Sequence, residues 1–160
     1  MTDLHLTSVP ITKTGMRVRK PVADVFEAIL DPAITTNFWF TRGSGRLEVG
    51  KPVQWSWEMY DITITVTATA IEPDKRITIE WPGYTGTTTV EWRFTSLADG
   101  TTFVEVTERG FTGDGDALVK QATDSTQGFS LMLAGLKAYL EYGVRLELVA
   151  DRYPAGIAEH

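Results

Sequence analysis

The residues that could do chemistry are few, and they do not form a familiar catalytic motif. The two histidines, His5 and His160, lie near the ends of the chain, so no central imidazole is available as a general base. The sequence contains neither the G-x-S-x-G motif of a serine nucleophile nor the H-E-x-x-H motif of a zinc enzyme. Because there is no cysteine, thiolate catalysis, disulfides and cysteine-ligated metal sites are excluded. We assign no catalytic residue and expect no cofactor.

Two aspartates, Asp114 and Asp116, stand in the stretch GDGD, which is similar to the start of a calcium-binding loop. The twelfth position counted from Asp114 is Ser125, where such a loop carries a glutamate. The stretch is therefore more typical of a turn that caps a helix, and we expect no metal site.

Glu108 is the acidic residue with the clearest functional potential. It continues the alternation of Val104 and Val106 in the segment TFVEVTE. If the strand extends this far, the carboxylate points into the protein, where it could act as an acid, a base or a hydrogen-bond partner. If the strand has already ended, the side chain lies in solvent. The sequence leaves both possibilities open.

Aromatic and flexible apolar side chains recur at positions that should face inward. They could line a cavity for an apolar or aromatic ligand, or they could simply fill the core. Trp39 differs, because its loop or short helix should lie near the cavity mouth as a lid or an anchor. The candidate ligand-binding residues are Trp39, Trp55, Trp57, Trp81, Trp92, Glu108, Phe129, Met132, Leu136 and Tyr139.

Composition and charge exclude several classes of protein. The chain has 160 residues, of which 42% are hydrophobic and 22% charged, which is typical of a globular domain. The net charge of −6 repels phosphate backbones and anionic membrane surfaces, so we expect no nucleic-acid or membrane partner. No apolar segment is long enough to span a bilayer, and the N-terminal residues lack a secretory signal. We expect one cytoplasmic domain over residues 1–160.

The elements that must position these side chains follow from the hydrophobic period. Residues 11–20 alternate as a strand, and residues 20–32 change to helical spacing before Asp31-Pro32. A second short helix and a glycine-containing loop should follow in residues 33–45. Strict alternation then returns in a series of segments joined by short turns, which predicts an antiparallel meander with one buried face. These segments are residues 53–59, 62–70, 76–81, 88–95 and 102–108.

Residues 128–143 predict a long C-terminal helix that covers the buried face of the sheet. Asp124, Ser125 or Thr126 could cap its first turn. Its apolar stripe runs through Phe129, Met132, Leu133, Leu136, Tyr139, Leu140, Gly143 and Val144.

The remaining sides of this helix differ in character. A second apolar arc should pack against the N-terminal segment, a loop or another subunit, which gives a monomer or a weak homodimer. This arc contains Leu131, Ala138, Tyr142 and Leu146, and the expected solvent side contains Lys137, Glu141 and Arg145. Helical glycines are costly, so Gly135 and Gly143 predict a close approach of the sheet or of a ligand.

The order of these elements is that of a helix-grip fold, an α+β arrangement of a six- or seven-stranded curved antiparallel sheet around the C-terminal helix. The segments VFEAILDPAITTNFW, IEPDKRITIEW, GTTFVEVTERGF and GFSLMLAGLKAYLEYG resemble landmarks of the START-like SRPBCC superfamily over about residues 11–149. They are most similar to the branch named for activators of the heat-shock protein 90 ATPase. In this chain Phe129 stands where the family commonly has tryptophan, and Glu108 stands where many members have histidine.

The resemblance implies a cavity between the sheet and the C-terminal helix. We therefore expect the chain to bind a small hydrophobic or aromatic molecule there. A polyketide cyclase-like enzyme is an alternative, in which a carboxylate such as Glu108 assists proton transfer. The family name suggests a third role as a co-chaperone-like module that binds a chaperone.

Overall fold

The computed structural model describes residues 5–157, so residues 1–4 and 158–160 of the predicted domain, His160 among them, lie outside the described part. The described residues form a seven-stranded sheet, one long helix and several short helices. The elements are β1 (Thr12–Val18), α1 (Val22–Leu30), α2 (Pro32–Thr35), β2 (Arg42–Gly43), β3 (Pro52–Trp57), the 3-10 turn η1 (Glu58–Tyr60), β4 (Ile62–Glu72), β5 (Arg76–Pro82), β6 (Thr87–Ser96), β7 (Thr102–Arg109), α3 (Gly115–Tyr142) and α4 (Leu148–Arg152).

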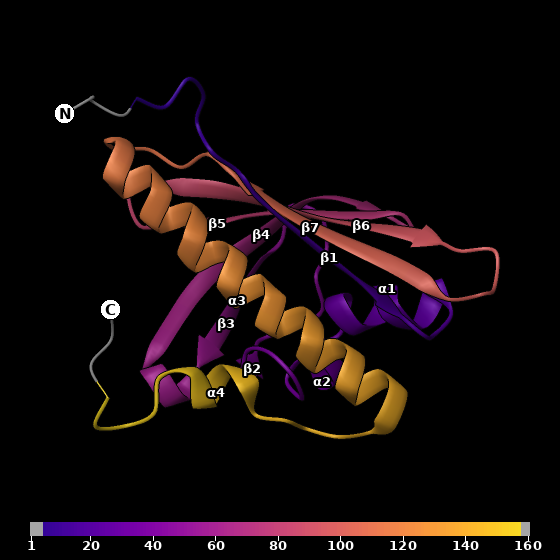
Figure 1. Cartoon of the computed structure of the whole chain (residues 1–160). Coiled ribbons are helices and arrows are strands. Elements are labelled where there is room, and N and C mark those ends of the chain that lie inside the picture. Colours follow the sequence, from indigo (N-terminus) through magenta and orange to yellow (C-terminus); the bar gives the residue numbers. More distant parts are fainter. Residues whose placement is uncertain (1–4, 158–160) are drawn as a thin grey trace.

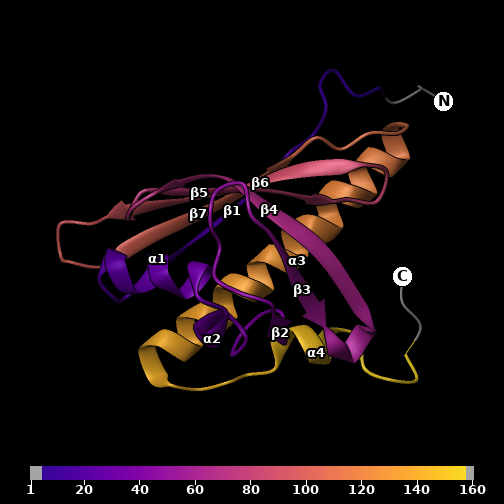
Figure 2. The same cartoon turned by 180° about the vertical axis from the view of Figure 1, so that it is seen from behind.

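The sheet is an antiparallel meander that is completed by its first strand. Strands β2 to β7 follow one another in order, and β1 pairs with β7 at the far edge. Figure 1 shows α3 crossing the sheet diagonally, and Figure 2 shows α1 and α2 beside the same helix from behind. The predicted helix-grip arrangement, with two short helices after the first strand, is confirmed.

The core lies where the inward face of the sheet meets the second half of α3. Phe129, Met132, Leu133 and Leu136 are buried on the helix, as the predicted stripe requires. They face fully buried strand residues of alternating phase, among them Ile77, Ile79, Trp92, Val104 and Val106. Among the helices in residues 5–157, no segment combines the length and apolar character that a bilayer crossing needs.

The long helix begins earlier than the sequence predicted. Its N-cap is Asp114, whose side chain accepts a hydrogen bond from the backbone N–H of Ala117 at 2.9 Å. The expected caps Asp124, Ser125 and Thr126 therefore lie inside the helix. Ser125 and Thr126 can occupy these positions because each hydroxyl group has an acceptor. The Thr126 hydroxyl donates to Ala122 O, and the Ser125 hydroxyl donates to Glu108 Oε1 of β7. The GDGD turn caps the helix, in agreement with the sequence.

The helix ends at Gly143, which has a left-handed backbone (φ +67°) and donates its N–H to Tyr139 O at 2.8 Å. This is a glycine C-cap, so the chain turns away before Val144 could extend the buried stripe. The following segment returns to η1, where the Tyr60 hydroxyl donates to the Val149 carbonyl of α4. Leu131 faces this segment, whereas Tyr142 is 74% exposed.

The expected solvent side of the helix is partly buried. Glu141 accepts hydrogen bonds from the Arg19 backbone N–H at 3.0 Å and from Lys137, and its side chain is only 6% exposed. Lys137 also donates to Arg17 O. The helical wheel placed these residues in water because it could not show that the chain between β1 and α1 lies against this side of α3.

Leu136→Ala is expected to lower the free energy of unfolding by about 2–5 kcal/mol, because Leu136 is fully buried in the packed core. Leu131→Ala is the matched control on the same helix and should cost less, since Leu131 is only partly buried and lines a pocket. Denaturant unfolding measures both. A loss below about 1 kcal/mol for Leu136→Ala would contradict its place in the packed core.

Glu141→Gln is expected to lower the free energy of unfolding near neutral pH by about 1–3 kcal/mol. Burial alone would raise the pKa of Glu141, but the hydrogen bonds from Arg19 and Lys137 outweigh it and hold the pKa below its usual value. A carboxyl group with a lowered pKa in the folded state stabilises the protein above its unfolded pKa and loses that effect as pH falls through the folded pKa. Denaturant unfolding at several pH values should therefore show that the difference in the free energy of unfolding between wild-type protein and Glu141→Gln shrinks as pH falls. Glu58→Gln is the control, because Glu58 is exposed, and it should change the free energy of unfolding little. A loss of stability in Glu141→Gln that does not depend on pH would refute the stabilising role of the Glu141 carboxylate.

Candidate functional site

Trp39 stands at the centre of an aromatic cluster that includes all five tryptophans of the chain. Its ring centroid lies 5.1 Å from Trp55, 5.7 Å from Trp57, 6.0 Å from Trp81 and 5.8 Å from Trp92. Trp39 is 7% exposed, so it serves as a buried anchor, whereas a lid residue would lie at the surface. Edge-to-face contacts of this kind add to the stabilisation from burial.

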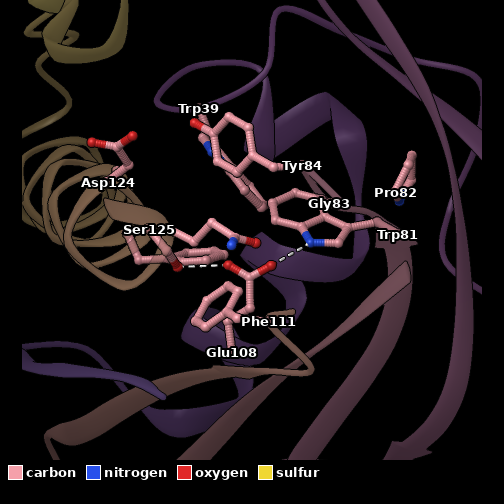
Figure 3. A pocket seen from close by; sticks show the side chains of 12 residues that line it. Trp39, Trp81, Pro82, Gly83, Tyr84, Glu108, Phe111, Asp124 and Ser125 are labelled. Atoms are coloured by element: carbon pink, nitrogen blue, oxygen red, sulfur yellow. Dashed lines mark hydrogen bonds between the residues drawn. The ribbon is translucent and has the colours of Figure 1, made fainter. Parts of the chain in front are cut away.

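One side of the aromatic cluster is open. A pocket of about 320 Å³ lies between α3 and the chain that follows β5 and β7 (Figure 3). It is lined by Trp39, Trp81, Pro82, Gly83, Tyr84, Glu108, Phe111, Gln121, Asp124, Ser125, Gly128 and Phe129.

A second pocket of about 620 Å³ adjoins the first and extends toward η1 and α4. The two share a wall, so we treat them as one cleft and call them the inner pocket (320 Å³) and the outer pocket (620 Å³). The shared residues are Trp39, Trp81, Pro82, Tyr84, Asp124 and Gly128.

The residues expected to bind a ligand separate into two groups. Trp39, Trp81, Glu108 and Phe129 line the inner pocket, and Trp57 lines the outer pocket. The others line neither pocket: Trp55, Trp92, Met132 and Leu136 are fully buried in the core, and the half-buried Tyr139 has its ring against Phe38. The open space therefore lies toward the first half of α3, away from the centre of the sheet.

Glu108 is inward-facing, as its strand phase allowed. In β7 it pairs with Thr12 of β1 and Val90 of β6, and it is only 5% exposed. Its Oε2 accepts from the Trp81 indole N–H at 2.8 Å and from the Thr88 hydroxyl. Its Oε1 accepts from the Ser125 hydroxyl at 2.6 Å. Figure 3 shows the carboxyl group between Ser125 and Trp81, where it ties the sheet to the helix.

The other charges of the cleft lie nearer to solvent. Asp124 accepts a hydrogen bond from Lys120 at 2.9 Å, and this contact together with the charge of Asp124 raises the pKa of Lys120. Lys120 and Arg152 line the outer pocket. Within residues 5–157, no cluster of three or more histidine, aspartate or glutamate side chains is arranged to hold a metal ion.

Several lining residues were not identified from the sequence. The helical ones continue the predicted apolar stripe backward at helical spacing through Gly128, Ser125 and Gln121. A helix predicted to begin after Asp114 would have included Ser125 and Gln121. Tyr84 and Phe111 lie in turns beyond the strands, and no periodic signal marks such positions.

The sequence matches the family described as "Activator of Hsp90 ATPase homolog 1-like protein" over residues 19–141. Among solved structures, protein SSP2350 from Staphylococcus saprophyticus is 32% identical, with a TM-score of 0.74 over 86% of this chain and 96% of that one. A search of curated proteins found no match.

Two more distant structures show the same fold. The Aha1 dimer from Colwellia psychrerythraea is 17% identical, with a TM-score of 0.69 over 84% of this chain and 98% of that one. CalU16 from Micromonospora echinospora is 15% identical, with a TM-score of 0.64 over 92% of this chain and 93% of that one.

Gly128→Ala is expected to raise the free energy of unfolding by up to about 1 kcal/mol, because alanine is the better helix former and its Cβ would meet no atom within 4 Å. Gly135→Ala is the matched comparison on the same helix. Its Cβ would lie 3.1 Å from Phe38 O and 3.2 Å from Phe38 Cβ, so crowding should offset the gain. Thermal or denaturant unfolding measures both. Equal stabilisation by the two substitutions would contradict the close approach at Gly135, and no gain from Gly128→Ala would contradict an open cleft at Gly128.

Proposed function

The chain belongs to the Activator of Hsp90 ATPase homolog 1-like family, and we propose that it binds a small hydrophobic or aromatic molecule in the cleft beside α3. The observation that carries this proposal is the inner pocket, whose lining includes the rings of Trp39, Trp81, Tyr84, Phe111 and Phe129. Its volume of about 320 Å³ falls in the range of small-molecule sites. Rings on several sides suit a flat ligand, because they bury both of its faces.

The lining of the cleft also supports a binding role. Protein cores are normally close-packed, and an unfilled space beside five aromatic rings loses their dispersion contacts unless a ligand supplies them. Gly128 stands in the wall shared by the two pockets and leaves room that any side chain would occupy. A glycine in mid-helix is costly for stability, and an open binding cleft gives a reason for it.

Native mass spectrometry of the freshly purified protein tests the proposal. We expect a co-purifying small molecule, and we expect the neutral fluorophore N-phenyl-1-naphthylamine to bind in its place after gentle removal. Gly128→Trp should fill the cleft and weaken fluorophore binding by about tenfold or more, a loss of at least about 1.4 kcal/mol. Val119→Trp places the same ring on the exposed side of α3 and is the matched control.

Three results would count against this proposal or change it. Failure of wild-type protein to bind either the co-purifying molecule or the fluorophore would refute it, as would equal binding by the two tryptophan variants. Conversion of the bound molecule by wild-type protein would favour a cyclase-like enzyme. Stimulation of an Hsp90 ATPase that is unaffected by Gly128→Trp would favour the chaperone role that the family name describes.

A further inference from the structure

The charges that line the inner pocket are of one sign. Of its twelve lining residues, Glu108 and Asp124 are acidic, and none is lysine, arginine or histidine. Asp124 already has Lys120 as its partner. Glu108 forms no ion pair within residues 5–157, and its partners Trp81, Thr88 and Ser125 are all uncharged. A buried carboxylate normally has a cationic partner, so the pocket offers an anion that lacks one.

The hydrogen bonds of Glu108 leave one acceptor position open. Oε2 accepts from both Trp81 and Thr88, whereas Oε1 accepts only from Ser125. Each carboxylate oxygen can accept two hydrogen bonds, so Oε1 retains a lone pair at the pocket wall. Figure 3 shows the carboxyl group held from both sides, by Ser125 and by Trp81, which fixes its orientation before any ligand enters.

The aromatic walls favour the same kind of ligand group. The face of an aromatic ring carries negative charge density and attracts an organic cation, most strongly for tryptophan. Trp39, Trp81 and Tyr84 line the pocket around Glu108 (Figure 3). The net charge of −6 draws cations toward the protein and repels anions.

We infer that the ligand of this cleft is a ring-bearing apolar molecule that ends in a protonated amine, with the ammonium group bound by Glu108 Oε1. The inference rests on the proposed binding function and specifies the chemical class of the ligand. The apolar body lies against the aromatic walls, and the shared wall at Gly128 lets it extend into the outer pocket.

Three probes with the same ring test the inference: 2-naphthylmethylamine, 2-naphthylmethanol and 2-naphthoate. Their affinities for wild-type protein are measured by calorimetry near neutral pH. The amine should bind more tightly than the alcohol by about tenfold or more, which is the contribution of one charge-assisted hydrogen bond. The naphthoate should bind most weakly, because its carboxylate would face Glu108. In ¹H–¹⁵N spectra, the indole signal of Trp81 should shift when the amine binds.

Substitution of the carboxylate locates the effect. Glu108→Gln should remove the preference for the amine over the alcohol, which is read as the ratio of the two affinities measured on that variant. Glu105→Gln removes the same charge from the outer side of the same strand and should keep the preference. If Glu108→Gln does not fold, the inference is tested by the order of the three affinities in wild-type protein alone.

The outcomes separate the inference from the proposed function. Equal binding of the three probes, tightest binding of naphthoate, or an amine preference that survives Glu108→Gln would overturn the inference while apolar binding stands. If neither the three probes nor N-phenyl-1-naphthylamine binds, the proposed function fails, and the inference fails with it.

Discussion

The structure depends on the close approach of α3 to the chain at Phe38. A Cβ at Gly135 would lie 3.1 Å from Phe38 O, so only glycine lets the helix come this near without displacement. This contact seats Leu136 and Met132 in the core and sets where the second half of the helix lies. A helix of 28 residues is a rod of about 42 Å, whereas the sheet beside it twists. The first half of α3 therefore cannot pack equally closely against every strand. The cleft lies where this half of the helix stands away from the sheet.

Two sets of polar contacts hold the first half and the middle of α3. On one side, Thr14 of β1 is bonded to Ser130 at 2.9 Å, and the Thr12 hydroxyl donates to Ala122 O. On the other side, Ser125 donates to Glu108. Glu108 is thus both a strut between sheet and helix and part of the pocket wall. A group with two such roles is fixed in position by the fold, which is what a binding site requires of the residue that orients its ligand.

The sequence predicted what depends on local periodicity and missed what depends on distant packing. Alternation placed Trp55 and Trp92 on the inward face and allowed Glu108 there if the strand reached it, and helical spacing placed Leu136 there. Neither pattern could distinguish a core residue from a pocket residue, because Trp55 and Trp81 share the same inward phase yet only Trp81 borders open space. Trp39 gave no periodic signal, and its central position arises from contacts with four elements. Glu141 was placed in solvent because the wheel of one helix contains nothing about the chain between β1 and α1.

Stability and the proposed binding depend on largely separate residues in this molecule. The side chains at the middle of the sheet, such as Trp92 and Leu136, are fully buried and do not reach the cleft. The cleft is instead lined by the turn after β5, the segment after β7 and the first half of α3, where a substitution changes fewer core contacts. Such a division lets one fold hold different ligands through changes at its rim. Trp39, Phe129 and Glu108 are exceptions, because they are buried and also line the cleft. Since Glu108 joins the sheet to the helix, a ligand that binds its carboxylate would also act on the contact between them.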